Sequence, residues 1–208
     1  HRISLRHICI KLSGGRSGPK GTGVLFTRQG IPLTNVIEGG AQERGKRAGT
    51  ENVPGIMGLA AALKEACDHI DENAAKVSAL RDQLIAGLSR IPHSALNGDP
   101  VHRLPGNVNF CFEGIEGESL LLLLDQAGIC ASSGSACTSG SLDPSHVLLA
   151  IGRPHEVAHG SLRLSLCEWN TQEDVDHILK EVPRIVEYLR SISPVWKELV
   201  RGEKQFML

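Results

Sequence analysis

Residues 133–140 constrain this 208-residue chain most strongly, because they set one cysteine, Cys137, in a run of Gly, Ser, Ala and Thr. Such a run has almost no apolar surface to bury, so it cannot form part of a core. We therefore expect Cys137 to lie exposed on a loop, whereas most free cysteines are buried like small hydrophobic residues. A solvated linker with an incidental cysteine is the alternative interpretation.

Composition limits the core and the classes of partner. Hydrophobic residues make up 41% of the chain but aromatic residues only 3%, so the core must be aliphatic. The net charge of −1 does not favour a nucleic-acid partner, and the basic N-terminal stretch lacks the interleaved aromatics of a nucleic-acid arm. No apolar run approaches the ~20 residues of a membrane span. The six cysteines show neither C-x-x-C pairs nor zinc spacing, so we expect no metal site and a reducing, cytoplasmic setting.

Local patterns predict a mixed α/β chain in three segments. We expect residues 1–16 to be an atypical basic segment foreign to the fold, 17–92 to end a larger domain with long helices, and 93–208 to form a small α+β domain. The predicted strands are 22–26 (buried), 108–112, 129–131 and 161–166. The predicted helices are two between 53 and 91, one over 118–127, and one from a Thr171–Asp174 capping box to about 192.

Several residues outside the cysteine run have alternative interpretations. The glycine-bearing loop 39–50 precedes a predicted helix, so it is either a phosphate site at a helix N-terminus or a charged surface loop. Arg163, within an apolar strand, either faces water or binds a carboxylate or phosphate. We expect Cys67, Cys111 and Cys167 to pack in the core, and the spacing of the histidines after Cys137 matches no metal motif.

Five segments in this order resemble the cysteine desulfurases, pyridoxal-phosphate enzymes of the class V aminotransferase family. They are 18–23 (Gly-Pro-Lys-Gly-Thr-Gly), 39–50, Arg103-Leu104-Pro105 with Asn109, 133–140, and 161–166. The Ala-Cys-Thr-Ser-Gly sequence and the later Ser-Pro-Val-Trp sequence are most similar to the NifS type, associated with nitrogen fixation. The resemblance implies the C-terminal part of that transferase fold, which is the end of the large domain plus the small α+β domain.

The resemblance also implies roles for particular residues. Cys137 would be the nucleophile that takes sulfur from L-cysteine as a persulfide, which could transiently ligate an iron–sulfur cluster, and L-alanine would be released. Arg163 would bind the substrate carboxylate, and Thr50 would bind the phosphate of pyridoxal 5'-phosphate across a homodimer interface. The sulfur would then pass to a scaffold protein of the IscU/NifU type for iron–sulfur cluster assembly.

The chain departs from the family pattern near its start. Gly15 stands where the family has its Schiff-base lysine, and Gly14 where a histidine precedes it. The family's enzymes are about twice this length, so the residues of their N-terminal half that contact the cofactor ring are not located here. We therefore expect this chain alone to be catalytically incomplete, and we attribute residues 1–16 to a translation out of frame. The alternatives are a selenocysteine lyase or other class V relative, and a non-catalytic remnant that dimerises or docks to a scaffold.

Overall fold

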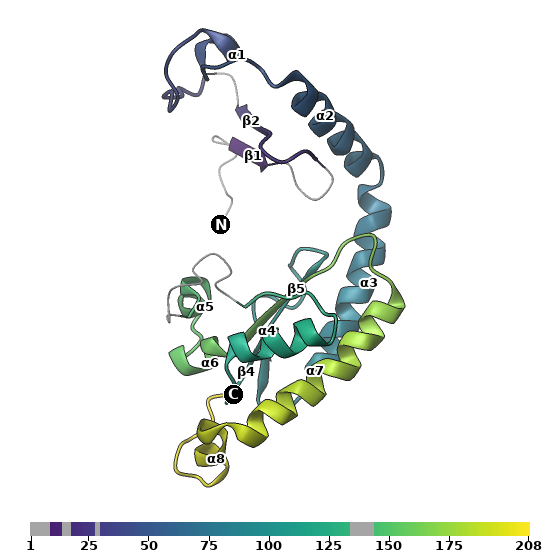
Figure 1. Ribbon diagram of the computed structural model, residues 1–208, viewed down its shortest axis with the longest axis vertical. Helices are drawn as coiled ribbons and strands as arrows, with labels where there is room; N and C mark the ends of the chain where they lie inside the picture. The colour runs from purple at the N-terminus through teal and green to yellow at the C-terminus, as the bar shows by residue number, and fades with distance from the viewer. Residues whose placement is uncertain (1–8, 14–17, 28–29, 134–143) are drawn as a thin grey trace. The chain divides into compact units, whose positions relative to one another are not determined.

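A computed structural model describes residues 9–13, 18–27, 30–133 and 144–208 (Figure 1). By its internal contacts the chain divides into two compact units, His1–Ile70 and Asp71–Leu208. The division falls between two long helices, upstream of the boundary that we expect after residue 92, and the three-segment domain scheme stays a prediction.

The first unit contains a two-stranded antiparallel ribbon and one long helix. Strand β1 (Cys9–Ser13) pairs with β2 (Gly23–Thr27) in a register that sets Cys9 opposite Thr27. After the short α1 (Gln42–Gly45), α2 (Val53–Asp68) begins at Asn52, whose side chain accepts a hydrogen bond from the N–H of Gly55. Asparagine is a favoured N-cap, so the sequence alone explains where α2 starts.

The turn before β2 lies against the first turn of α2. The hydroxyl of Thr22 donates to the carbonyl of Pro19 at 2.7 Å, which closes the turn. A Cβ placed on Gly55 would lie 2.4 Å from the methyl carbon of Thr22, so glycine is needed for this close approach. Among the residues of this unit whose burial the structure describes, Gly55 alone is buried.

The second unit is built on a three-stranded antiparallel sheet in the order β3-β4-β5. The strands are β3 (Ser94–Leu96), β4 (Asn107–Phe112) and β5 (Ser161–Ser165). The register sets Asn109 opposite Arg163 and Cys111 opposite Ser161. Because side chains alternate along a strand, the sheet has one apolar face and a second face that carries Asn109, Cys111 and Arg163.

Helices cover the apolar face of this sheet and build the main core with it. They are α3 (Ile70–Leu88), α4 (Gly117–Gln126) and α7 (Gln172–Ile192), and Figure 1 shows α4 and α7 running beside the strands. The core is aliphatic apart from two phenylalanines, as the composition predicts; its fully buried side chains include Phe110, Phe112, Leu84, Leu88, Leu120, Leu124, Leu162, Val175 and Val182. Each such side chain contributes about 1.5–3 kcal/mol relative to an exposed one.

Two short helices pack on the second face of the sheet. These are α5 (His146–Ala150) and α6 (His155–His159), and their side chains Leu148, Val157 and Ala158 form a small cluster with Cys111. The last helix, α8 (Pro194–Val200), begins at Ser193, whose hydroxyl accepts from the N–H of Trp196.

Several sequence-based predictions are confirmed, and others are wrong. The two helices after residue 53, the helix stopped by Gly128, and the Thr171–Asp174 capping box are all present. Strand β2 is exposed rather than buried, and a single bridge at Ser132 replaces the strand expected over 129–131. Cys111 is buried as expected, but Cys67 is exposed and Cys167 only half-buried. Strand β3 and helices α5, α6 and α8 are too short to give a periodic signal.

Candidate functional site

Arg163 lies in the middle of β5, on the second face of the sheet, and is half-buried. Its backbone N–H donates to the carbonyl of Ser132 at 2.6 Å, and its carbonyl accepts from the N–H of Ser132 at 3.1 Å. One guanidinium nitrogen also reaches the hydroxyl of Ser132 at 3.4 Å. Within the described residues no carboxylate forms an ion pair with Arg163.

The segment that carries Cys137 starts beside Arg163. Cys137 itself, together with residues 134–143, lies outside the described residues. Ser132 and Ser133 lead into this segment, and α5 follows it. Because Ser132 is bonded to Arg163 through both backbone and side chain, the chain enters the Cys137 segment directly at the guanidinium-bearing strand.

A buried polar network, which the sequence analysis missed, lies beside Arg163. The side chain of Asn97 is buried, donates to the amide oxygen of Asn109 at 2.8 Å and accepts from Arg153 at 2.7 Å. Arg153 also donates to the carbonyl of Leu96, so it ties β3 to the segment between α5 and α6. Buried polar groups need such partners, and the network orders the Asn109–Arg163 pair. Asn97 belongs to no recognisable motif and therefore gives no sequence signal.

The motif residue Arg103 supports the same strands. Its guanidinium donates to the carbonyls of Asn107 and Asn97 at 3.1 and 3.2 Å. Burial is the main cause that lowers the pKa of Arg103, and the nearby positive charge of Arg81 lowers it further. The structure thus gives the Arg-Leu-Pro motif a positioning role between the ends of β3 and β4.

Thr50, the predicted phosphate ligand, is exposed in the first unit, just before α2. Two nearby N–H groups, those of Gly49 and Gly55, already have partners. Gly49 donates to the side chain of Gln42 at 3.1 Å, and Asn52 accepts from Gly55 in the first turn of α2. The Arg47 guanidinium donates to the carbonyl of Gly49 at 2.8 Å. The Thr50 hydroxyl itself has no hydrogen bond among the described residues.

The residues present do not fit covalently bound pyridoxal phosphate. At the position of the family's lysine the sequence has Gly15, which has no amine, and this position lies outside the described residues. In the first turn of α2 the N–H of Gly55 already donates to the side chain of Asn52. We therefore derive no reaction step through this cofactor. Among the described residues no group of three or more His, Cys, Asp or Glu could hold a metal ion.

A family model of the class-V aminotransferases matches residues 15–178. This chain belongs to that family. Cysteine desulfurase IscS of Methanosarcina thermophila is 57% identical to this class-V chain over 187 residues, which are 89% of this chain and 46% of the relative. Cysteine desulfurase NifS of Azotobacter vinelandii is 51% identical over 179 residues, 86% of this chain and 44% of the relative.

Solved structures agree with this family assignment. A NifS-like protein from Rickettsia africae superposes on this class-V chain with a TM-score of 0.76 and 31% identity, covering 85% of this chain and 47% of that protein. The class-V chain therefore spans about half the length of the curated relatives it matches. The fold is that of the NifS-like enzymes, which are mixed α/β proteins, as the motifs predict. No helix among the described residues is both long enough and apolar enough to cross a bilayer.

Proposed function

We propose that this chain is the C-terminal portion of a cysteine desulfurase, in which Cys137 accepts sulfur and Arg163 binds the carboxylate of L-cysteine. The observation that carries the proposal is the bonding of Arg163 to Ser132, at the start of the Cys137 segment. Relatives with the names IscS and NifS, at 57% and 51% identity, support it.

The proposed chemistry at Cys137 is a transfer of sulfur to a thiolate. The thiolate forms a bond to the outer sulfur of a donor, and the bond between that sulfur and its carrier breaks, with the electron pair leaving on the carrier. When the donor is a persulfide, the carrier leaves as a thiolate and the step balances without a cofactor. Release of L-alanine from L-cysteine itself would also need pyridoxal phosphate, which would take up the electron pair at the substrate carbon. Arg163 holds the carboxylate through paired charge-assisted hydrogen bonds, which keeps the donor sulfur oriented toward the cysteine segment.

The destination of the sulfur follows from the same proposal. The persulfide on Cys137 passes its outer sulfur to a scaffold protein of the IscU/NifU type, for iron–sulfur cluster assembly in the cytoplasm. A homodimer would bring Thr50 of one chain to the phosphate of a cofactor that its neighbour holds without a covalent bond, because Gly15 offers no amine. The assembly would serve general cluster formation or, as the NifS relative suggests, nitrogenase maturation.

Sulfur acceptance by Cys137 is the first test. The purified chain is incubated with cysteine persulfide, and the mass of each cysteine-containing peptide is measured over time. We expect the Cys137 peptide to gain one sulfur atom at least tenfold faster than the peptide with the exposed Cys130, because the proposal gives the sulfur-accepting role to Cys137 alone. The Cys137→Ser variant is the control. Equal rates at Cys137 and Cys130 would contradict the assigned role.

Stand-alone activity is the second test, and it separates the enzyme from a non-catalytic remnant. With pyridoxal phosphate and L-cysteine, we expect neither a lysine-aldimine absorption band nor alanine from this chain, because Gly15 offers no amine. Cysteine-dependent alanine formation would prove this wrong and establish a complete enzyme. If the chain forms no aldimine and no alanine but Cys137 takes up sulfur, the result supports the portion of a desulfurase. If Cys137 takes up no sulfur either, the result supports the non-catalytic remnant.

A further inference from the structure

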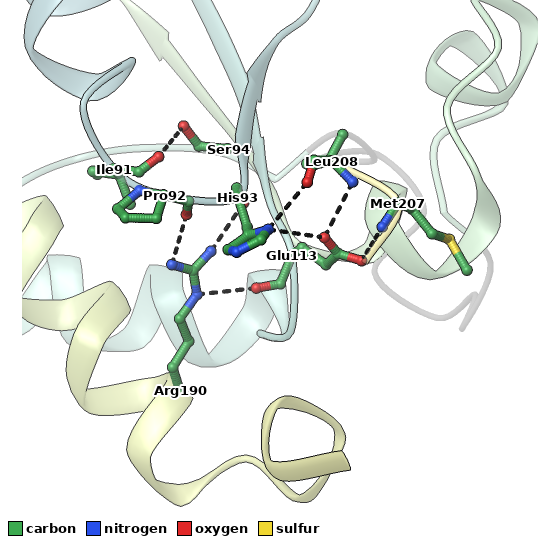
Figure 2. A network of polar contacts seen from close by, with 8 residues as sticks. All are labelled: Ile91, Pro92, His93, Ser94, Glu113, Arg190, Met207 and Leu208. Atoms are coloured by element: carbon green, nitrogen blue, oxygen red, sulfur yellow. Dashed lines mark hydrogen bonds and ion pairs between the residues drawn. The ribbon is translucent and has the colours of Figure 1, made fainter. Parts of the chain in front are cut away.

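Residues 205–208 are held at a site built from β4 and the loop before β3. Figure 2 shows Glu113, at the end of β4, beside His93 and the backbone of Met207 and Leu208. The Glu113 carboxylate accepts from the N–H of Met207 at 2.8 Å and from the N–H of Leu208 at 3.2 Å. Glu113 is a buried residue with 5% exposure, and a buried carboxylate needs donors of this kind.

His93 supplies a second contact to the same segment. Its ring stacks on Phe206 with centroids 3.7 Å apart, and Nδ1 lies 3.0 Å from the carbonyl oxygen of Leu208. Trp196 meets both rings edge-on, at 5.6 and 5.4 Å. His93 has a φ of 50°, which is unfavourable for a non-glycine residue, so the surrounding contacts must hold it.

Arg190 of α7 fixes the backbone of this site. Its guanidinium donates to the carbonyls of Pro92, His93 and Glu113 at 2.8, 2.9 and 3.0 Å (Figure 2). The guanidinium also stacks over the Trp196 ring. Desolvation by burial lowers the pKa of Arg190 to about 10, so the guanidinium stays charged at neutral pH. Arg190 therefore orders the site indirectly. It holds the backbone at residues 92, 93 and 113, and it stacks on Trp196, which in turn contacts Phe206.

Leu208 provides the third contact, and it connects the segment to α5 and α6. Its side chain is half-buried against the cluster of Cys111, Leu148, Val157 and Ala158. Gln205 and Met207 are exposed, and Phe206 keeps 37% exposure despite its stacking on His93. A cavity of about 650 Å³ borders the segment and is lined by residues of α6 and α8. The segment is thus held at three separate points, which are the Glu113 carboxylate, the His93 ring and the apolar cluster.

We propose that Glu113, His93 and the apolar cluster around Cys111 form a peptide-recognition site whose ligand in this chain is the segment 205–208. The site binds three features of a peptide. An aromatic ring stacks on His93, an aliphatic side chain two positions later packs in the cluster around Cys111, and two successive backbone N–H groups donate to Glu113. Occupancy of the site braces α5 and α6, which pack on the Arg163 face of the sheet. The proposal does not depend on the sulfur chemistry of Cys137.

The test compares two double variants of the full chain, in which alternate positions of the segment are substituted. Phe206→Ala with Leu208→Ala removes the side chains that contact His93 and the apolar cluster. Gln205→Ala with Met207→Ala removes the two side chains at the alternate positions. Hydrogen exchange is followed at the amides of Ile151 and Ala158, which close α5 and α6. We expect exchange there to accelerate about tenfold or more in the first double variant, to stay unchanged in the second, and to stay unchanged in α7 in both.

A synthetic peptide of residues 203–208 then tests recognition directly. Added in excess to the Phe206→Ala, Leu208→Ala chain, it should restore slow exchange at Ile151 and Ala158, whereas a peptide with the same two alanines should not. Failure of the wild-type peptide to restore protection would overturn the proposal. An equal acceleration in α7 would also overturn it, because the segment would then contribute only to global stability.

Discussion

Two cysteines in the second unit have opposite environments, although both fall in or near strands. Cys111 on β4 is fully buried, and its sulfur accepts a hydrogen bond from the Asn97 side chain at 3.2 Å. Burial raises the pKa of the Cys111 thiol above its ordinary value, because the thiolate would lose its hydration. Cys130, which follows α4, is exposed. Exposure, not sequence context, therefore separates a structural thiol from an accessible one.

The burial of Cys111 predicts low reactivity. In the native chain we expect iodoacetamide at neutral pH to label Cys130 at least tenfold faster than Cys111, since the thiolate is the reacting species. In urea the two rates should become similar. Peptide mass spectrometry measures both rates in one sample, and comparable labelling of Cys111 in the native chain would be evidence against the packing described here.

Helix α7 shows how a local motif defines the start of an element. The Thr171 hydroxyl accepts from the N–H of Asp174 at 3.4 Å, and the Asp174 carboxylate accepts from the N–H of Thr171 at 3.1 Å. The side chain of Asn170 also donates to Asp174, and it is the main cause that lowers the pKa of this carboxyl; the Thr171 backbone is the second. The whole capping box lies within a few residues, which is why the sequence predicts it.

The capping box predicts a pH dependence of stability. Because the pKa of Asp174 is lower in the folded chain, its contribution is present above the unfolded value of 3.8 and is lost as pH falls through the folded value. We expect Asp174→Ala to lower the free energy of unfolding by about 0.5–1 kcal/mol at neutral pH. The difference from wild type should shrink as the pH falls below 3.8.

Urea denaturation at several pH values measures this difference. Asp176→Ala removes an exposed carboxylate of the same helix outside the capping box, and it should change the unfolding free energy by less than about 0.5 kcal/mol. A constant deficit of Asp174→Ala at every pH would show that the helix start is stabilised by something other than the charge of this residue.

At the scale of the whole molecule, the buried residues are distributed very unevenly. Every hydrophobic residue of the two core clusters lies between Leu80 and Leu208. In the first unit, apolar side chains such as Phe26, Met57 and Ile70 are 57%, 65% and 61% exposed. A two-stranded ribbon beside one helix buries too little apolar surface to offset the loss of chain entropy.

This distribution predicts that the second unit folds by itself. We expect residues 71–208 to unfold cooperatively in urea, with the midpoint of the corresponding transition in the full chain. Residues 1–70 alone should show no cooperative transition. Circular dichroism and tryptophan fluorescence measure both, because Trp169 and Trp196 lie in the second unit. A non-cooperative 71–208 fragment would mean that its core needs the first unit.

Local physics accounts for what the sequence by itself determined. Helix periodicity, the capping box at Thr171 and the glycine stop at Gly128 each depend on residues a few positions apart, so α2, α3, α4 and α7 could be predicted. The motif order predicted the family, which the match over residues 15–178 confirms. The exposed position and role of Cys137 stay predictions.

Only the tertiary structure decided which distant residues meet. Arg163 bonds to Ser132, Asn97 joins Arg153 to Asn109, and Glu113 accepts the backbone of residues 207 and 208. The exposure of β2 and Cys67 was also decided there, because a strand or helix is buried only if another element covers it. Such pairings depend on how strands and helices pack across long sequence separations, and no local pattern in the chain encodes them.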